Sequence, residues 1–320
     1  SAVKPITARC RNAARHREVA LEFTKMGMMD ETHMLKPYAD RVSGTYALLK
    51  SVVSLTEQYG EDIKKRREES TASLEKGTFY PTSWKVDSTR VSELTFKGYH
   101  ADTILSKVTG LPRLRYDQDR PFEKVIPYYN YFTPTDSVRI PSAYVIPKGW
   151  DYLQQHLDHN AIEYSRIGRD TTLLAEVYHI SNFSTRGQAY EGHYPHYNTE
   201  LTSSMDSVLV KEGSLWIPTD QPGVRYLIET LEPAATDSFF NWNFFDAILQ
   251  RKEGFSPYVF EDLMEQLLLE DEGLRTAYEE KKNSDEAFSN NGYRQLYWLY
   301  ERSPYAEKEF RRYPVIRIME

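Results

Sequence analysis

Between residues 76 and 230 the sequence is a series of short runs rich in Val, Ile, Thr, Tyr and Phe, interrupted by Gly and Pro. Such runs favour β-strands, because branched and aromatic side chains fit a pleated, half-buried surface. After Gly149, the spacing of Leu153 and Leu157 instead predicts one short helix. This mixture predicts an α+β fold rather than a pure barrel. We expect strands at residues 91–99, 142–146, 173–180, 208–217 and 226–230.

An amphipathic helix is predicted upstream of this region, over residues 42–59. Apolar residues recur mostly three or four positions apart, as one face of a helix requires, at positions 42, 46, 49 and 53 and then 55 and 59. Residues 61–69 carry balanced charges, which indicates a solvated helix end or a linker. Residues 28–38 begin apolar and meet Pro37, so we expect a strand that runs into a loop.

Helix signals return after Phe239. Ser256 precedes Pro257, which places an N-cap residue before a proline at the first helical position. Two more helices are expected at residues 274–282 and 293–300. The β-branched run at residues 314–318 predicts a final strand that returns to the sheet.

Charge and composition exclude several classes of function. The chain has 47 acidic against 40 basic residues and a net charge of −7, the opposite of what a phosphate backbone attracts. We therefore expect no nucleic-acid partner. The absence of an 18-residue apolar run predicts that no segment spans a membrane. The single cysteine, Cys10, excludes an internal disulfide and a zinc site made of several thiolates.

Histidine spacing does not reveal a helical zinc motif. None of the eight histidines is followed three residues later by Glu, so the sequence contains no His-x-x-Glu. Glu191, His193 and His196 are residue types that suit zinc, but Gly192 and Pro195 keep the two histidines off one helical face. We interpret this group as polar residues of a strand and turn, with metal binding as the alternative. The pair His156 and His159 is interpreted in the same way.

Two aromatic groups have two alternative interpretations. Residues 127–132 and 239–245 are dense in Tyr, Phe and Trp. They could line a peptide or carbohydrate groove, since these rings offer flat apolar faces, and Tyr and Trp add a polar atom. Packing in the core between sheet and helices is the alternative, which we favour because large aromatics dominate burial in a domain of this size.

Before the predicted helix the chain reads Glu31-Thr32-His33-Met34-Leu35-Lys36-Pro37-Tyr38. Arg41-Val42 and the helix containing Thr45-Tyr46 follow. Together these segments resemble the end of the catalytic domain in bacterial zinc carboxypeptidases of the carboxypeptidase A-like family. The resemblance extends over roughly residues 26–320. Downstream motifs that resemble the accessory C-terminal region of large family members are Ser142-Ala143-Tyr144-Val145-Ile146-Pro147, Tyr190-Glu191-Gly192-His193, Thr219-Asp220-Gln221-Pro222, Leu231-Glu232-Pro233, Trp242-Asn243-Phe244-Phe245-Asp246, Ser303-Pro304-Tyr305 and Tyr313-Pro314-Val315.

This resemblance implies a zinc metallocarboxypeptidase, in which Glu31 is the general base that activates a zinc-bound water. His33, two residues further, would share its strand face. The resemblance also implies that the zinc ligands precede this chain, so we expect the chain alone to hold no zinc and to be inactive. Residues 1–75 would be the last strand and helix of the α/β peptidase domain. Residues 76–320 would be an accessory domain, β-rich to about 230 and then mainly helical.

The expected partners are a peptide or protein substrate and a preceding peptidase portion. The resemblance implies export to the periplasm or the cell exterior. The alternative from another class is a non-catalytic accessory module that binds peptide or glycan, which would need only stacking faces and a few polar groups.

Overall fold

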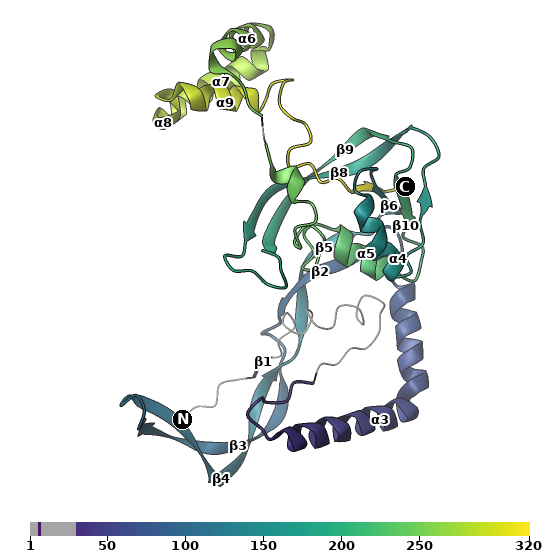
Figure 1. Cartoon of the computed structure of the whole chain (residues 1–320), viewed down its shortest axis with the longest axis vertical. Helices are drawn as coiled ribbons and strands as arrows, with labels where there is room; N and C mark the ends of the chain where they lie inside the picture. The colour runs from purple at the N-terminus through teal and green to yellow at the C-terminus, as the bar shows by residue number, and fades with distance from the viewer. Residues whose placement is uncertain (1–5, 8–29, 252) are drawn as a thin grey trace.

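A computed structural model describes residues 6–7, 30–251 and 253–320. The chain is elongated, with a β-rich core in the middle, a group of helices at one end, and a long helix and a β-hairpin at the other (Figure 1). Helices and sheets are both abundant and segregated along the chain, so the predicted α+β class is confirmed.

The core is a six-stranded antiparallel sheet with the order β7-β10-β6-β11-β8-β9. The final strand lies between β6 and β8, so the end of the described chain is paired on both sides. Its strands are β6 (Ala143–Ile146), β7 (Ser165–Arg166), β8 (Thr171–Thr185), β9 (His196–Val210), β10 (Leu215–Pro218) and β11 (Ile316–Ile318).

The sheet carries an apolar cluster on each face, because successive side chains of a strand point to opposite sides. On one side, Tyr144 and Ile146 pack with the short helices and with the loop that carries Phe240 and Phe245, which we call the core loop. On the other side, Val145 packs in a smaller apolar cluster of the same sheet. The helices beside the sheet are η1 (Asp151–Leu153), α4 (Gln154–His159), α5 (Val224–Leu231) and η2 (Asp246–Leu249).

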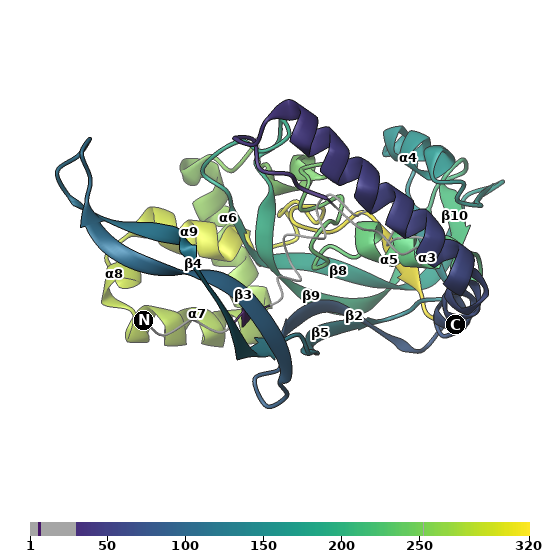
Figure 2. The same ribbon diagram turned by 90° about the horizontal axis from the view of Figure 1, so that it is seen from below.

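Helix α3 (Tyr38–Ala72) and two β-ribbons project from this core (Figures 1 and 2). One ribbon pairs β2 (Phe79–Val86) with β5 (Phe132–Arg139), and its core end packs on α5. The other is the hairpin of β3 (Ser92–Leu105) and β4 (Pro112–Tyr129), to which β1 (Ile6–Thr7) adds a short parallel strand.

The C-terminal helices have an apolar cluster of their own, built around Phe260, Met264, Leu299 and Tyr300. They are α6 (Pro257–Glu270), α7 (Glu272–Ser284), α8 (Glu286–Ser289) and α9 (Gly292–Tyr300). Ser256 is the residue before α6, as predicted, and the Asp271 carboxylate caps α7 by accepting from Leu274 N–H. No helix within the described ranges has the length and apolar character to cross a lipid bilayer.

The structure corrects three sequence predictions. Residues 226–230 were expected to be a strand but belong to α5, because Val224, Leu227, Ile228 and Leu231 recur at helical spacing and all face the core. Residues 208–217 form parts of two strands, since Gly213 (φ 88°) reverses the chain between them. The strand expected within 28–38 is absent from its described part, residues 30–38; Met28 and Met29 lie outside the described residues.

Candidate functional site

Glu31, to which the resemblance assigns the general base, is exposed in an irregular stretch before α3. Beside it, Asp30 accepts a hydrogen bond from the Thr45 hydroxyl at 3.1 Å, and His33 Nδ1 accepts one from Leu35 N–H at 3.2 Å. These contacts close a turn and fasten the stretch to α3. Glu31 and His33 therefore do not share the face of a strand, and the catalytic role of Glu31 stays a prediction.

Glu191 and His193 lie in the connection between β8 and β9. Glu191 and Gly192 both have positive φ, 50° and 80°, and the backbones of Tyr190 and His193 exchange two hydrogen bonds across them. This segment is therefore a turn at Gly192, as the sequence predicted. The ring of His193 lies against the rings of Trp242 and Phe244, with centroids 5.6 and 6.1 Å apart, so this histidine belongs to an aromatic surface cluster.

His196 is buried, and both of its ring nitrogens have partners. Nε2 lies 3.0 Å from Asp246 Oδ1, and Nδ1 lies 2.9 Å from the Thr185 hydroxyl. Because an ionised carboxylate can only accept, Nε2 carries the proton and Nδ1 accepts from Thr185. Asn243, held at φ 67°, donates to Asp246 and to the Tyr194 carbonyl and thereby closes the loop over the histidine.

This network leaves His196 without a free lone pair for a metal ion. The network contains a hydroxyl, an imidazole and a carboxylate, which come from Thr185, His196 and Asp246. The aromatic rings of Phe183 and Phe240 enclose the imidazole, with ring centroids 4.7 and 5.1 Å from its own. We interpret the network as an anchor that joins the end of the β8–β9 hairpin to the core loop. Across the described part of the chain, no three His, Cys, Asp or Glu side chains gather closely enough to hold a metal ion.

The two aromatic groups lie in different places. Phe239, Phe240 and Phe245 are buried in the core, whereas other rings of the two groups are partly buried, among them Tyr128, Tyr129, Tyr131, Trp242 and Phe244. Trp242 and Phe244 lie on the core loop, where Phe244 stacks on Tyr152 and meets His156 edge-on at 5.0 Å. Burial and the neighbouring His159 lower the pKa of His156. The others, Tyr128, Tyr129 and Tyr131, lie at the base of the hairpin ribbons.

A buried ion pair that sequence reasoning missed joins Glu232 to Arg317. Glu232 is fully buried and Arg317 is 3% exposed; Arg317 Nε lies 2.9 Å from Glu232 Oε1, and the Tyr144 hydroxyl donates to the same oxygen at 2.6 Å. Burial raises the pKa of Glu232, while Arg317 and then Tyr144 lower it. Arg317 also contacts Glu176 and the Arg139 carbonyl. The only sequence signal is an arginine within an otherwise apolar final strand.

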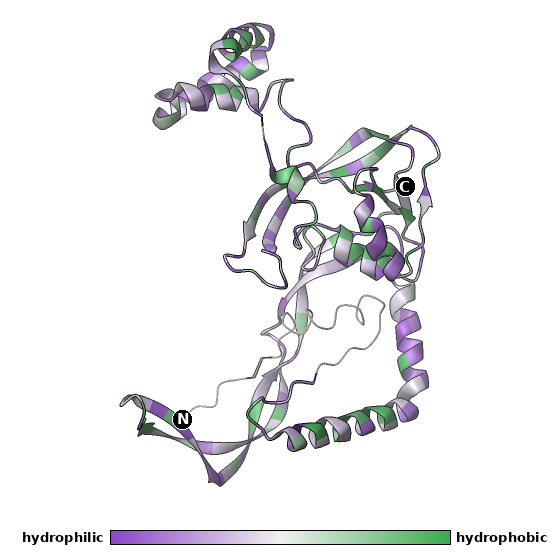
Figure 3. Cartoon of the chain, in the orientation of Figure 1, coloured by the Kyte–Doolittle hydropathy of each residue, from purple (hydrophilic) through white to green (hydrophobic). Residues whose placement is uncertain are grey.

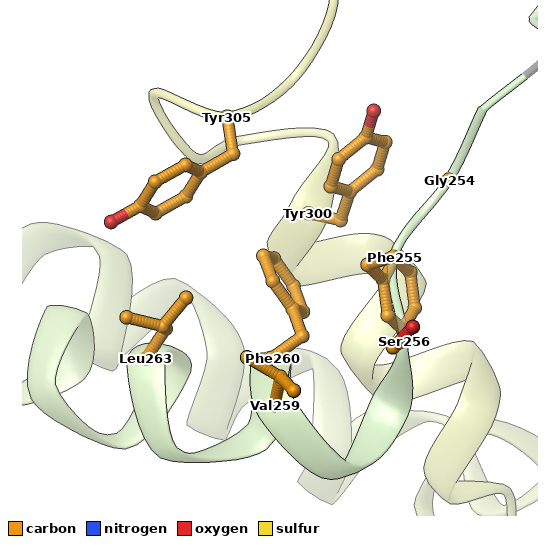
Figure 4. Close-up of a pocket in the computed structure, with 8 residues that line it drawn as sticks. All are labelled: Gly254, Phe255, Ser256, Val259, Phe260, Leu263, Tyr300 and Tyr305. Carbon is orange, nitrogen blue, oxygen red and sulfur yellow. The ribbon is translucent and has the colours of Figure 1, made fainter.

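Arg317 lines one wall of a cavity of about 620 Å³ between β5, β8, β9 and the end of the chain. Each end of its guanidinium already has a protein partner, so the group is a poor anion receptor and holds the strands together instead. A second cavity, of about 320 Å³, lies between α6 and the end of α9 (Figure 4). Phe255, Phe260, Tyr300 and Tyr305 dominate its lining, which offers hydroxyls but no acid, base or metal ligand at neutral pH.

Within the described residues, α3 carries an exposed apolar stripe. No residue of this helix is buried, and four apolar residues three or four positions apart are about half exposed or more; Val53, for example, is 69% exposed. Figure 3 shows hydrophobic bands along this helix. We call this stripe the α3 seam, and its members are Val42, Tyr46, Leu49 and Val53.

Comparison of the chain with protein-family models, with curated proteins and with solved structures finds no match. The carboxypeptidase resemblance therefore stands on its sequence motifs, and the geometry of the chain carries the functional argument.

Proposed function

We propose that this protein is a non-catalytic interaction protein that works as a subunit in an assembly of its own copies, with the α3 seam as a main contact. The proposal rests on one observation: the apolar spacing along α3 is typical of a buried face, but that face is exposed. The spacing of Val42, Tyr46, Leu49 and Val53 is that of a buried helix face, yet the described chain leaves it in water. A second copy that presents the same seam would cover it.

The total surface supports this. The chain exposes 21514 Å², whereas a compact monomer of 37.4 kDa exposes about 13,700 Å². The 28 residues outside the described part can contribute at most about 4,700 Å² to the exposed surface. Without that contribution, the chain still exposes about 3,000 Å² more than the compact monomer would. A standard protein interface buries about 800 Å² on each partner, so the excess is enough for several interfaces.

The chemistry of the seam suits helix–helix pairing between copies. Positions 42, 46, 49 and 53 follow the four-three-four spacing of a coiled coil, in which helices interdigitate apolar side chains. Burying such a side chain fully contributes about 1.5–3 kcal/mol. Because the four side chains are on average about 60% exposed, burying their remaining exposed surface on both copies would give about 7–14 kcal/mol, which compares with an association cost of about 4–15 kcal/mol.

The experiment is light scattering coupled to size-exclusion chromatography of the full chain, from micromolar to near-millimolar concentration. We expect a mass that is a multiple of 37.4 kDa. The double variant Leu49→Glu/Val53→Glu should shift the mass toward the monomer, because the carboxylates cannot enter an apolar seam unpaired. Its circular dichroism should match that of the wild type, since neither side chain supports the core.

The matched control is Tyr258→Glu/Leu269→Glu, which places the same two charges on exposed apolar residues of α6. It should leave the oligomer mass unchanged. A wild-type chain that remains monomeric at every concentration would contradict the proposal, as would a Leu49→Glu/Val53→Glu variant that keeps the wild-type mass.

Zinc carboxypeptidase activity with Glu31 as the base stays a prediction from the resemblance, as does the binding of peptide or glycan. Zinc analysis and a peptide hydrolysis assay on the same preparation test the activity, because stoichiometric zinc with turnover lost in Glu31→Gln would support an enzyme. Absence of both together with self-association would support the interaction protein.

A further inference from the structure

The outer end of the β3–β4 hairpin projects freely from the molecule (Figures 1 and 2). We call residues 103–116 the hairpin tip. Thr103 pairs with Leu114 and Leu105 with Pro112, and the chain reverses at Gly110, where φ is 70°. The β-ribbon continues for about ten further residues on each strand before it reaches β2 and β5, so the tip stands well away from the core.

The hairpin tip has one apolar face, and its two arginines lie on the other face. Directly paired residues of an antiparallel ribbon point to the same side. Leu105, Pro112 and Leu114 therefore share one face, while Arg113 and Arg115 share the other with Ile104, and Asp102 lies opposite Arg115 at the inner end of that face. The tip thus presents an apolar face without charge and a second face that carries both arginines.

The connecting loop adds exposed apolar residues at the extreme end. Val108 is 94% exposed and Leu111 is 66% exposed, and Figure 3 shows hydrophobic colour at this end of the hairpin. Lys107 is also exposed there. Exposed apolar side chains that are grouped at one projecting end mark a candidate interaction surface.

The charge of the hairpin tip differs from that of the rest of the chain. Residues 103–116 contain Lys107, Arg113 and Arg115 and no Asp or Glu, which gives three positive charges, whereas the whole chain carries −7. A partner of this tip should therefore be negatively charged and able to accept aliphatic side chains.

We propose that the hairpin tip docks on the surface of an anionic lipid bilayer. Val108 and Leu111 would enter the boundary between headgroups and acyl chains, to the depth of about 5–10 Å that is typical of interfacial segments. Lys107, Arg113 and Arg115 would contact the anionic headgroups. Aliphatic side chains favour lipid over nucleic acid, because single-stranded nucleic acid is held by aromatic stacking and the tip offers only Tyr116.

The experiment is sedimentation of the full chain with vesicles of phosphatidylcholine and phosphatidylglycerol, compared with phosphatidylcholine alone. We expect binding to the anionic vesicles that weakens as salt is raised, and about fivefold weaker partitioning for each basic residue changed to Gln. The variant Val108→Asp/Leu111→Asp should lose binding. The control Leu269→Asp should bind as the wild type does.

A second measurement reports insertion directly. Val108→Trp should show a blue-shifted emission that brominated lipids quench, because the indole would leave water. The proposal is overturned if the wild-type chain does not sediment with anionic vesicles, or if Val108→Asp/Leu111→Asp sediments equally well. Displacement of the vesicles by duplex or single-stranded DNA would also overturn it, since the tip would then contact nucleic acid. A lower oligomer mass of the Val108→Asp/Leu111→Asp variant would overturn it as well, since the tip would then contact another copy.

Discussion

Replacing Arg317 by Met should destabilise the β-core strongly at neutral pH and weakly in acid. Glu232 is fully buried, and Arg317 is the cation closest to it among the described ion pairs, at 2.9 Å. Removing one partner of a buried pair costs about 3–5 kcal/mol, because the remaining charge has lost its compensation. With a urea dependence of about 2–3 kcal/mol per molar, the unfolding midpoint should fall by about 1.5 M near pH 7.5.

The pH dependence follows from the sign of the pKa shift. Burial already raises the pKa of Glu232 above its unfolded value, and removing Arg317 raises it further. The carboxyl is then protonated more readily in the folded chain, so the folded state loses stability as pH rises above the unfolded value of about 4.3. At pH 4 and below, the carboxyl is mostly neutral in both states. The loss should shrink to about 1–2 kcal/mol, the value of the missing hydrogen bonds.

Urea titrations at the two pH values, followed by tryptophan fluorescence, measure this difference between wild type and variant. The control is Lys211→Met, since Lys211 follows β9 and pairs with Asp170 at 2.7 Å while both side chains are at least half exposed; it should cost at most about 1 kcal/mol. Adding Glu232→Gln to Arg317→Met should recover part of the loss. An Arg317→Met effect that is equal at both pH values, or no larger than that of the control, would refute the reasoning.

Two other predictions concern the core loop and the two histidines that contact it. Phe245→Ala removes a fully buried ring whose centroid lies 5.0 Å from that of Trp150, so it should lower the free energy of unfolding in urea by about 3–5 kcal/mol. The control Phe79→Ala removes an exposed ring and should lower it by about 0.5 kcal/mol or less. His193→Ala/His196→Ala should not change the zinc content measured by atomic absorption, because both nitrogens of His196 are already bound in the protein; loss of one tightly bound zinc per chain would contradict this.

Local sequence was enough to locate much of the secondary structure. The spacing of Val42, Tyr46 and Leu49 predicted a helix, and Ser256 with Pro257 predicted the start of another, because helix periodicity and capping involve residues only a few positions apart. Where two patterns overlapped, sequence reasoning was wrong: residues 226–230 are rich enough in branched and aromatic residues to suggest a strand, and their helical spacing was overlooked.

Tertiary structure alone decided which surfaces and charges meet. Nothing within a few residues of Glu232 or Arg317 indicates that they pair, since they are distant in the chain and meet only because β11 inserts between β6 and β8. In the same way, the pattern of α3 shows that one face of the helix is apolar but not what covers it. That depends on where the rest of the chain lies, and the described core packs elsewhere, which leaves the α3 seam exposed.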